Sequence, residues 1–285
     1  MAALPFIKMH GLGNDFVVLD ARARDVALTG GQASSIADRH TGVGCDQIIT
    51  VGAARNAGAD AFMRIQNADG SEVEACGNAT RCVADMLMRE RGTDRAVIET
   101  VVGLLPATRA SGGRIAVDMG SARLDWREIP LAEACDTLRV PIAHGALKEP
   151  VAVSMGNPHA VFIVPDAERA PVAEAGPILE HHRMFPQRAN IEFVQVLDRG
   201  RVRMRVWERG VGITQACGSG ACAAAVAAIR RGLTDRKVQV ILDGGTLELE
   251  WREDGHVVMT GPVATSFTGE LPASLIGGGR TEAAA

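Results

Sequence analysis

The feature of this sequence that most constrains its fold is an internal repeat covering nearly the whole chain. Residues 63–120 match residues 204–261 at a constant offset of 141 without a gap. Upstream the offset is 143, where Gly13-Asn14 matches Gly156-Asn157 and Gln47, in the segment 45–51, matches Asn190, in the segment 189–196. A repeat of this length predicts two similar halves, each folding around its own core. The aligned identities include Met63/Met204, Arg64/Arg205, Cys76/Cys217, Gly77/Gly218, Ala84/Ala225, Arg89/Arg230, Gly103/Gly244 and Gly120/Gly261.

The repeat predicts two domains and a connection: an N-terminal repeat domain at residues 1–120, a crossover at 121–147 and a C-terminal repeat domain at 148–275. In both copies, short β-branched or alternating segments such as residues 61–67 and 201–208 are typical of strands. One segment of helix-forming residues follows each Cys-Gly pair and ends near a glycine, which predicts a helix. The expected fold class is α/β (α+β), with two pseudo-symmetric domains, each a mostly antiparallel sheet wrapped around a central helix.

The charge and the distribution of apolar residues indicate which classes of binding partner to expect. The net charge is -4 over 285 residues and the basic residues are spread along the chain, so no basic patch for nucleic acid is expected. No stretch approaches about 18 uncharged apolar residues, and the N-terminus lacks a basic head before a long apolar run, so we expect neither a membrane span nor a signal peptide. We therefore expect a cytoplasmic protein that acts on a small molecule.

The number and spacing of the cysteines and lysines indicate whether the protein is expected to bind a metal or an organic cofactor. Six cysteines without a secretion signal are expected to be thiols. The spacings Cys76/Cys82 and Cys217/Cys222 do not fit CxxC, and no histidine pair follows at zinc-finger spacing, so no metal site is expected. The chain has three lysines, none beside a phosphate-binding glycine loop, which disfavours pyridoxal phosphate. We expect no cofactor.

Cys76 and Cys217 stand at equivalent places in the repeat, and each precedes a glycine at the start of a predicted helix. A helix N-terminus is expected to lower a thiol pKa below its free value of roughly 8.5 and to offer N–H groups to a carboxylate. Moving a proton between the two faces of a stereocentre requires a base on one side and an acid on the other. Two symmetry-related thiols, one of them ionised, supply that pair.

Other polar residues also occupy equivalent positions, and a ring of such groups suits a zwitterionic ligand. His159 lies two residues from Asn157, and we interpret it as a proton-handling neighbour of the site rather than a core histidine. Arg209 has no basic counterpart in the first copy, so as a bidentate carboxylate binder it implies a second carboxylate on the ligand. The equivalent pairs are Asn14 with Asn157, Gln47 with Asn190, and Asn67 with Glu208.

The motifs KMHGLGNDFVVLD, GVGCDQI, NADGSEVEACGNATRC, GNPHAV, ANIEFVQV and ERGVGITQACGSGACAA resemble the diaminopimelate epimerase family from end to end. The resemblance implies the fold of that family and the interconversion of LL-diaminopimelate and meso-diaminopimelate, in lysine and peptidoglycan biosynthesis, with no cofactor. It implies Cys76 as general acid and Cys217 as general base for one direction. His159 and Glu208 would tune the reaction centre.

The resemblance also implies the residues that bind substrate and partner. Gly77, Asn78, Gly218 and Ser219 would hold the reacting carboxylate. Phe267 stands where the family commonly has a dimer-contact tyrosine, so a homodimer is expected. The ammonium groups and the distal carboxylate would be held by Asn14, Gln47, Asn67, Asn157, Asn190, Glu208 and Arg209.

Two other functions compete with this interpretation. A proline-racemase-like enzyme resembles this architecture but acts on a cyclic monocarboxylate, which would leave Arg209 without a partner carboxylate. A redox-sensing or ligand-binding module whose cysteines form a disulfide would cause no hydrogen exchange at a substrate carbon. Substrate preference and solvent hydrogen exchange therefore discriminate between the three.

Overall fold

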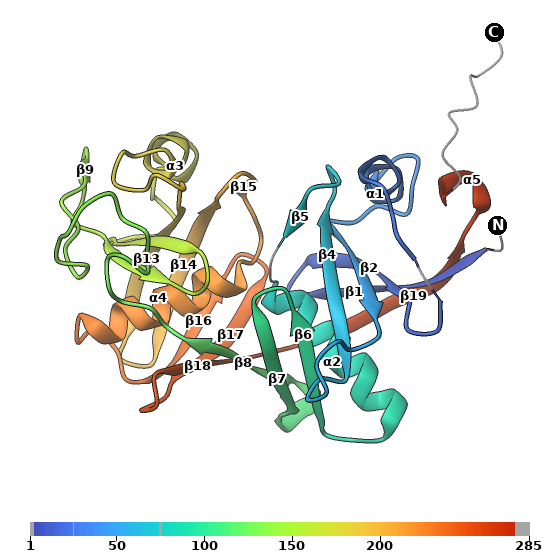
Figure 1. Cartoon of the computed structure of the whole chain (residues 1–285). Helices are drawn as coiled ribbons and strands as arrows, with labels where there is room; N and C mark the ends of the chain where they lie inside the picture. The colour runs from blue at the N-terminus through green and yellow to red at the C-terminus, as the bar shows by residue number, and fades with distance from the viewer. Residues whose placement is uncertain (1–2, 25, 74–75, 277–285) are drawn as a thin grey trace, which may run out of the picture. The chain divides into compact units, whose positions relative to one another are not determined.

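The computed structural model describes residues 3–24, 26–73 and 76–276 (Figure 1). The contacts within it divide the chain into two compact units. Unit 1 consists of Met1–Ile115 with Val263–Ala285, and unit 2 consists of Ala116–Pro262.

Unit 1 contains a mixed sheet and two longer helices. Its elements are β1 (Leu4–Gly11), β2 (Asn14–Asp20), α1 (Gly30–Ala37), β3 (Gln47–Gly52), β4 (Ala61–Asn67), β5 (Glu72–Val73), α2 (Gly77–Arg91), β6 (Arg95–Thr100), β7 (Gly103–Arg109), η1 (Ser111–Gly113), β19 (Ala264–Leu271) and α5 (Ala273–Ile276). The strands are ordered β19-β1-β2-β3-β4-β6-β7, and β5 pairs with β4. The β2–β3 and β4–β6 pairs are parallel because α1 and α2 connect them, and the other pairs are antiparallel.

Unit 2 repeats this arrangement. Its elements are β8 (Ile115–Ser121), β9 (Ala143–His144), β10 (Leu147–Lys148), β11 (Val151–Ser154), β12 (Pro158–Ile163), α3 (Val172–Glu180), β13 (Asn190–Asp198), β14 (Arg201–Glu208), β15 (Gly212–Ile213), α4 (Gly218–Arg230), β16 (Lys237–Leu242), β17 (Gly245–Trp251) and β18 (His256–Gly261). The strands are ordered β11-β12-β13-β14-β16-β17-β18-β8. The β12–β13 and β14–β16 pairs are parallel, as their counterparts in unit 1 are.

The strand registers follow the sequence repeat. Phe16 of β2 lies opposite Gln47 of β3, and the residues 143 positions later, His159 of β12 and Asn190 of β13, lie opposite each other in the same way. The unit boundaries differ from the expected domain boundaries at two places. Residues 121–147 belong to unit 2, and β19 belongs to unit 1 because it pairs with β1.

Each unit has a helix at the centre of its sheet, which confirms the predicted fold class. Helix α4 contacts β11–β14 and β16–β18, and its residues from Gly220 to Ala228 are buried on all sides (Figure 1). Alanine methyl groups allow strands to approach a helix closely, so the alanine-rich sequence suits this position. Helix α2 packs on β1, β2, β6 and β7 and ends at Gly92, whose φ of 65° is readily adopted by glycine.

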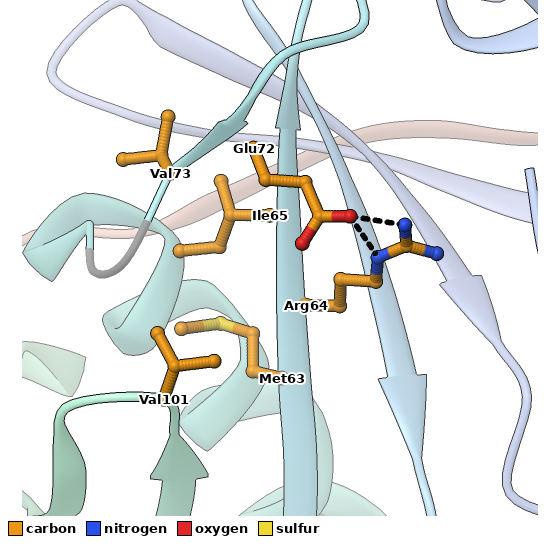
Figure 2. Close-up of a pocket in the computed structure, with 6 residues that line it drawn as sticks. All are labelled: Met63, Arg64, Ile65, Glu72, Val73 and Val101. Carbon is orange, nitrogen blue, oxygen red and sulfur yellow. Dashed lines mark hydrogen bonds and ion pairs between the residues drawn. The ribbon is translucent and has the colours of Figure 1, made fainter. Parts of the chain in front are cut away.

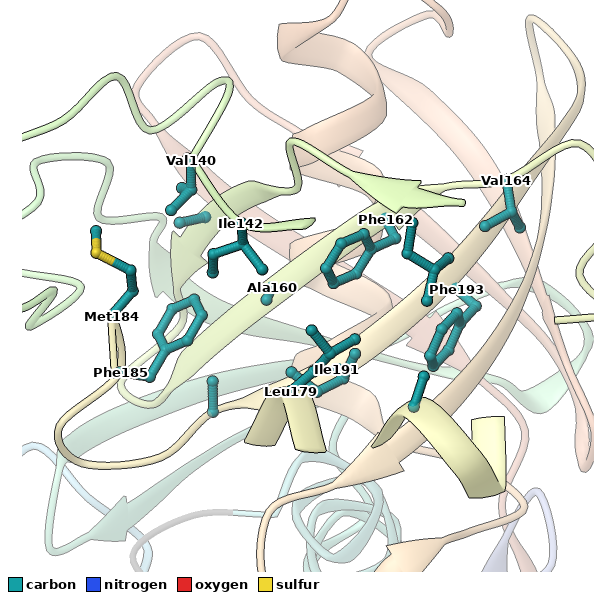
Figure 3. Close-up of a cluster of buried hydrophobic side chains, with 14 of the residues drawn as sticks. Val140, Ile142, Ala160, Phe162, Val164, Leu179, Met184, Phe185, Ile191 and Phe193 are labelled. Atoms are coloured by element: carbon teal, nitrogen blue, oxygen red, sulfur yellow. The ribbon is translucent and has the colours of Figure 1, made fainter. Parts of the chain in front are cut away.

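A second hydrophobic layer supports each sheet from the side opposite its central helix. In unit 2 the faces of β12 and β13 that point away from α4 pack on α3, with Phe162 and Phe193 stacked at a centroid separation of 6.2 Å (Figure 3). In unit 1 the corresponding cluster lies around α1 and includes Leu19, Ile36 and Ile48. These clusters fix the strands whose ends carry the polar residues discussed below.

Helices α1 and α3 are not among the elements expected from the sequence. Both are short, with sequences that include glycine, serine or an internal proline. The Thr29–Gln32 capping box was the local signal for α1, because it satisfies two free N–H groups at the helix start. Within the described part of the chain, no helix has the length and apolar character needed to cross a membrane.

Candidate functional site

Each unit carries its predicted site residues at one end of its sheet, beside the start of its central helix. In unit 1, Asn14 begins β2, Gln47 begins β3 and Asn67 ends β4, and these three strands are neighbours. We define the Cys76 cluster as Asn14, Gln47, Asn67, Cys76, Gly77 and Asn78. We define the Cys217 cluster as Asn157, His159, Asn190, Glu192, Glu208, Arg209, Cys217, Gly218 and Ser219.

In the Cys76 cluster, the thiol lies at the N-cap of α2 with an extended backbone, as the Cys-Gly motif predicts. Cys76 Sγ donates to Asn14 Oδ1 at 3.7 Å, and Asn78 Nδ2 donates to the same oxygen at 3.1 Å. Asn78 is buried. The structure therefore brings together three of the predicted residues, Asn14, Cys76 and Asn78.

Charged groups at both ends fix the orientation of these two amides. The buried Arg81 donates from Nη2 to Asn78 Oδ1 at 2.8 Å, and Asn14 Nδ2 donates to Asp46 Oδ2 at 2.9 Å. A guanidinium can only donate and a carboxylate can only accept, so each amide has one possible orientation. The carbonyl oxygen of Asn14 consequently faces Cys76.

Gln47 and Asn67 form a separate pair on the neighbouring strands. Gln47 Nε2 donates to Asn67 Oδ1 at 3.0 Å, and Asn67 Nδ2 donates to Ser71 Oγ at 3.0 Å. The buried Gln47 Oε1 has no hydrogen-bond partner among the residues that the structure describes. An unmatched buried acceptor of this kind suits an ammonium group, which has only donors.

In the Cys217 cluster, the thiol lies at the N-cap of α4. Cys217 Sγ accepts the Gly220 N–H at 3.3 Å and lies 3.6 Å from Ser219 Oγ. Asn157 Nδ2 donates to Ser219 Oγ at 3.4 Å. As in unit 1, the structure places the cysteine, the residue two positions after it and the paired asparagine together.

His159 is fully buried between two acceptors. Its Nδ1 lies 2.6 Å from Glu192 Oε1, and its Nε2 lies 2.9 Å from Asn157 Oδ1. Glu192 is also fully buried, and within the described residues its Oε2 has no hydrogen-bond partner. His159 is thus connected through Asn157 to Ser219, which lies beside Cys217.

Glu208 is the last residue of β14, and Arg209 follows it next to Asn190. Thr214 Oγ1 donates to Glu208 Oε1, and the Arg209 backbone N–H donates to Asn190 Oδ1 at 2.9 Å. The Arg209 guanidinium donates to the Gln187 carbonyl at 3.2 Å, and no carboxylate of the described residues lies within 4.0 Å of it. Arg209 is thus positioned by its backbone while its charge remains available to an anion.

Burial raises the pKa of Cys217 well above 9.0, and the nearby Glu208 and Glu192 raise it further. The expectation that the helix N-terminus lowers this pKa is wrong for Cys217. A helix dipole contributes about 0.3–1 kcal/mol, whereas burial can shift a pKa by about 3–5 units at 1.36 kcal/mol each. Burial likewise raises the pKa values of Glu192 and Glu208. Cys217 is therefore a neutral thiol at pH 7, suited to donate a proton.

Glu192 is not among the site residues expected from the sequence. Its signal was a carboxylate in the middle of the apolar segment 189–196, where a charged residue is rarely buried without a partner. The repeat gave a second signal, because Ile49 occupies the equivalent position in unit 1.

Two pockets lie elsewhere on unit 1. One of about 90 Å³ lies between β4, β5 and the β6–β7 turn, and the Arg64–Glu72 ion pair at its wall neutralises its charge (Figure 2). The other, of about 520 Å³, is lined by Arg22, Arg24 and Arg55 among others. Neither includes a predicted site residue or a thiol. Across the described residues, no group of three or more His, Cys, Asp or Glu side chains could hold a metal ion.

Solved structures share this fold. A phenazine biosynthesis protein of the PhzF family from Bacillus anthracis matches with a TM-score of 0.68 at 17% identity, covering 95% of this chain and 100% of that chain. A hydroxyproline epimerase from Agrobacterium vitis matches with a TM-score of 0.68 at 15% identity, covering 97% of each chain. At these identities the likeness concerns the fold.

Sequence comparisons are more specific. Diaminopimelate epimerase of Rhodospirillum centenum is 60% identical over 273 residues, covering 96% of this chain and 94% of the relative. The enzyme of the same name from Acidiphilium cryptum is 58% identical over 275 residues, covering 96% and 99%. The family model described as diaminopimelate epimerase matches residues 6–124 and 151–266, which follow the two copies of the repeat. The chain belongs to the diaminopimelate epimerase family.

Proposed function

We propose that this protein interconverts LL-2,6-diaminopimelate and meso-diaminopimelate by proton transfer between Cys76 and Cys217, without a cofactor. The product serves lysine and peptidoglycan biosynthesis. One observation carries the proposal: both units of a duplicated fold have a cysteine at the N-cap of the central helix. An equivalent asparagine contacts the cysteine itself in unit 1 and the residue two positions after the cysteine in unit 2. Membership of the family supports the choice of substrate.

In the proposed reaction, one thiolate removes the α-proton from one face of the carbon. The C–H bond breaks, an S–H bond forms, and the electron pair remains on the carbon and its carboxylate. The other thiol then donates its proton to the opposite face and becomes the thiolate. Because Cys217 is the neutral thiol at pH 7, it acts as the acid in one direction, and the roles reverse in the other.

The proposed contacts of the reacting carboxylate are the N–H groups at the starts of α2 and α4, from Gly77, Asn78, Gly218 and Ser219. These donors stabilise the negative charge that develops on the carboxylate as the proton leaves. Arg209 binds the distal carboxylate, since its guanidinium has no carboxylate partner among the described residues. Oxygens of Asn14, Gln47, Asn67, Asn157, Asn190 and Glu208 accept from the ammonium groups.

The test is incubation of the protein with LL-diaminopimelate in heavy water, followed by mass spectrometry and chiral separation. We expect one deuterium at the α-carbon of each meso molecule formed, because the donating thiol exchanges with solvent. We also expect chelator-treated protein to convert LL-diaminopimelate when no cofactor is added.

The rival functions predict different outcomes of the same experiment. A redox or binding module would leave the α-hydrogen in place. Racemisation of L-proline at a rate equal to that of diaminopimelate would overturn the assignment of substrate, because proline has no second carboxylate for Arg209.

We further propose a homodimer that uses the outer face of β19. Phe267 is 50% exposed on this edge strand and packs edge-on against Phe6, with ring centroids 5.9 Å apart. We expect Phe267→Glu to give a monomer by light scattering, because a charge at an apolar contact is costly to bury. Val101→Glu is the control, because Val101 is 63% exposed in the β6–β7 turn, outside this strand. A Phe267→Glu protein that still dimerises with unchanged affinity would show that the outer face of β19 is not the dimer contact.

We also propose a cytoplasmic location, because both thiols must stay reduced to exchange protons.

A further inference from the structure

Three positions differ between the two units in a coordinated way. His159, Glu192 and Gly220 of unit 2 align in the repeat with Phe16, Ile49 and Ala79 of unit 1. The aligned residues of unit 1 are fully buried and apolar. The same fold thus accepts an apolar trio where unit 2 has a histidine, a carboxyl group and a glycine.

The glycine at position 220 leaves room for the carboxyl group of Glu192. A Cβ atom at Gly220 would lie 2.9 Å from Glu192 Oε1 and 3.1 Å from Cys217 Sγ. A methyl group at this position would therefore collide with the carboxyl oxygen and the thiol. In unit 1, where isoleucine replaces the glutamate, the methyl group of Ala79 is accommodated.

A buried ionisable pair does not account for stability here. Taking both groups out of water is costly, and apolar replacements of similar volume are often neutral or stabilising. Unit 1 supplies those replacements in its own core. The retention of the pair next to Cys217 is therefore better explained by function than by folding.

The geometry also determines how many protons the His159–Glu192 pair holds. Both ring nitrogens of His159 face oxygen atoms, Glu192 Oε1 and Asn157 Oδ1, so each short contact requires one hydrogen. Wherever the proton between Nδ1 and Oε1 resides, the pair has no net charge. The hydrogen on Nε2 is then directed to Asn157, which donates in turn to Ser219 beside Cys217.

We propose that Glu192 is a positioning residue for the epimerisation, acting through His159 to orient Asn157 and Ser219 and to set the charge around Cys217. The proposal rests on the proposed function for its effect on turnover. Its effect on the thiol does not depend on substrate. The charged and titratable groups that face Glu192 are His159 from β12, Glu208 from β14 and Cys217 from the start of α4.

The first test is Glu192→Gln, which keeps the shape of the side chain and removes its charge. We expect kcat to fall about 10²-fold while KM changes less than about threefold, because the residue acts on proton transfer rather than on binding. In a Cys76→Ala background, the pH midpoint for alkylation of Cys217 by iodoacetamide should move down by about one unit. Although the pair is neutral as a whole, its carboxyl group lies close to Cys217 and opposes the thiolate, and the variant removes it.

The second test is the double variant His159→Phe with Glu192→Ile, which gives unit 2 the residues of unit 1 at two of the three positions and keeps Gly220. We expect its Tm to lie within about 5 °C of the wild-type value or above it. Asp85→Asn is the matched control, because it removes a buried, ion-paired carboxylate of unit 1. It should lower stability and leave the alkylation midpoint of Cys217 unchanged.

Two results would overturn the proposal. One is a folded Glu192→Gln protein with both kcat and the alkylation midpoint of Cys217 unchanged. The other is an unfolded double variant, which would make the pair a structural requirement. If the wild-type protein does not exchange the α-hydrogen of diaminopimelate, the proposed function fails, yet the alkylation midpoint still reports on Glu192.

Discussion

Replacing either Cys76 or Cys217 with alanine lowers kcat/KM for diaminopimelate by roughly 10⁴-fold, the upper end of what a general acid or base contributes. Each variant lacks a proton carrier on one face of the carbon, so neither completes the inversion. The measurement is formation of deuterated meso-diaminopimelate from the LL isomer in heavy water. Full activity of either variant would rule out the two-thiol mechanism.

The matched control for this experiment is Cys82→Ala. Cys82 is a fully buried thiol in α2, and Ala223 occupies its position in the repeat. Alanine is therefore already accepted at this place in the fold. We expect unchanged kcat/KM, which separates the loss of a proton carrier from the loss of any thiol.

Arg209→Met raises KM for diaminopimelate and lowers kcat/KM about 10²-fold. Losing the charge-assisted hydrogen bonds to the distal carboxylate costs about 3 kcal/mol. Because this carboxylate is remote from the reacting carbon, kcat should fall less than kcat/KM. Steady-state kinetics of the two variants Arg209→Met and Arg205→Met provide the comparison.

Arg205→Met is the control because Arg205 lies on β14, the strand that ends just before Arg209, and approaches Asp243 at 3.8 Å. It should leave kcat/KM within about twofold, as is usual for a partly exposed ion pair. If Arg209→Met and Arg205→Met behave alike, Arg209 does not bind the substrate.

Much of the fold could be predicted from the repeat and from periodicity. The strands at 61–67 and 201–208 and the two central helices have strong local patterns, and the structure confirms them. The place of β19 could not be predicted in this way. Its pairing with β1 joins residues more than 250 positions apart, and no local pattern specifies such a partner.

In the candidate site, too, the features set by local sequence could be predicted and those set by tertiary packing could not. The N-cap positions of Cys76 and Cys217 follow from a local motif, and the sequence predicts them. The electrostatic environment of Cys217 depends on tertiary packing that brings Glu192 and Glu208 to a buried thiol from two different strands. A rule based on the helix N-terminus alone therefore gave the wrong direction for the pKa of Cys217.

The pairing of β19 with β1 affects how the protein folds while it is being synthesised on the ribosome. Unit 1 contains the first 115 residues, yet one edge of its sheet is completed by a strand near the end of the chain. Until that strand is synthesised, the hydrogen-bonding edge of β1 has no neighbour on that side and is open to mispairing with other nascent chains. The half of the molecule made first is thus completed last, so an incomplete polypeptide cannot form both halves of the enzyme.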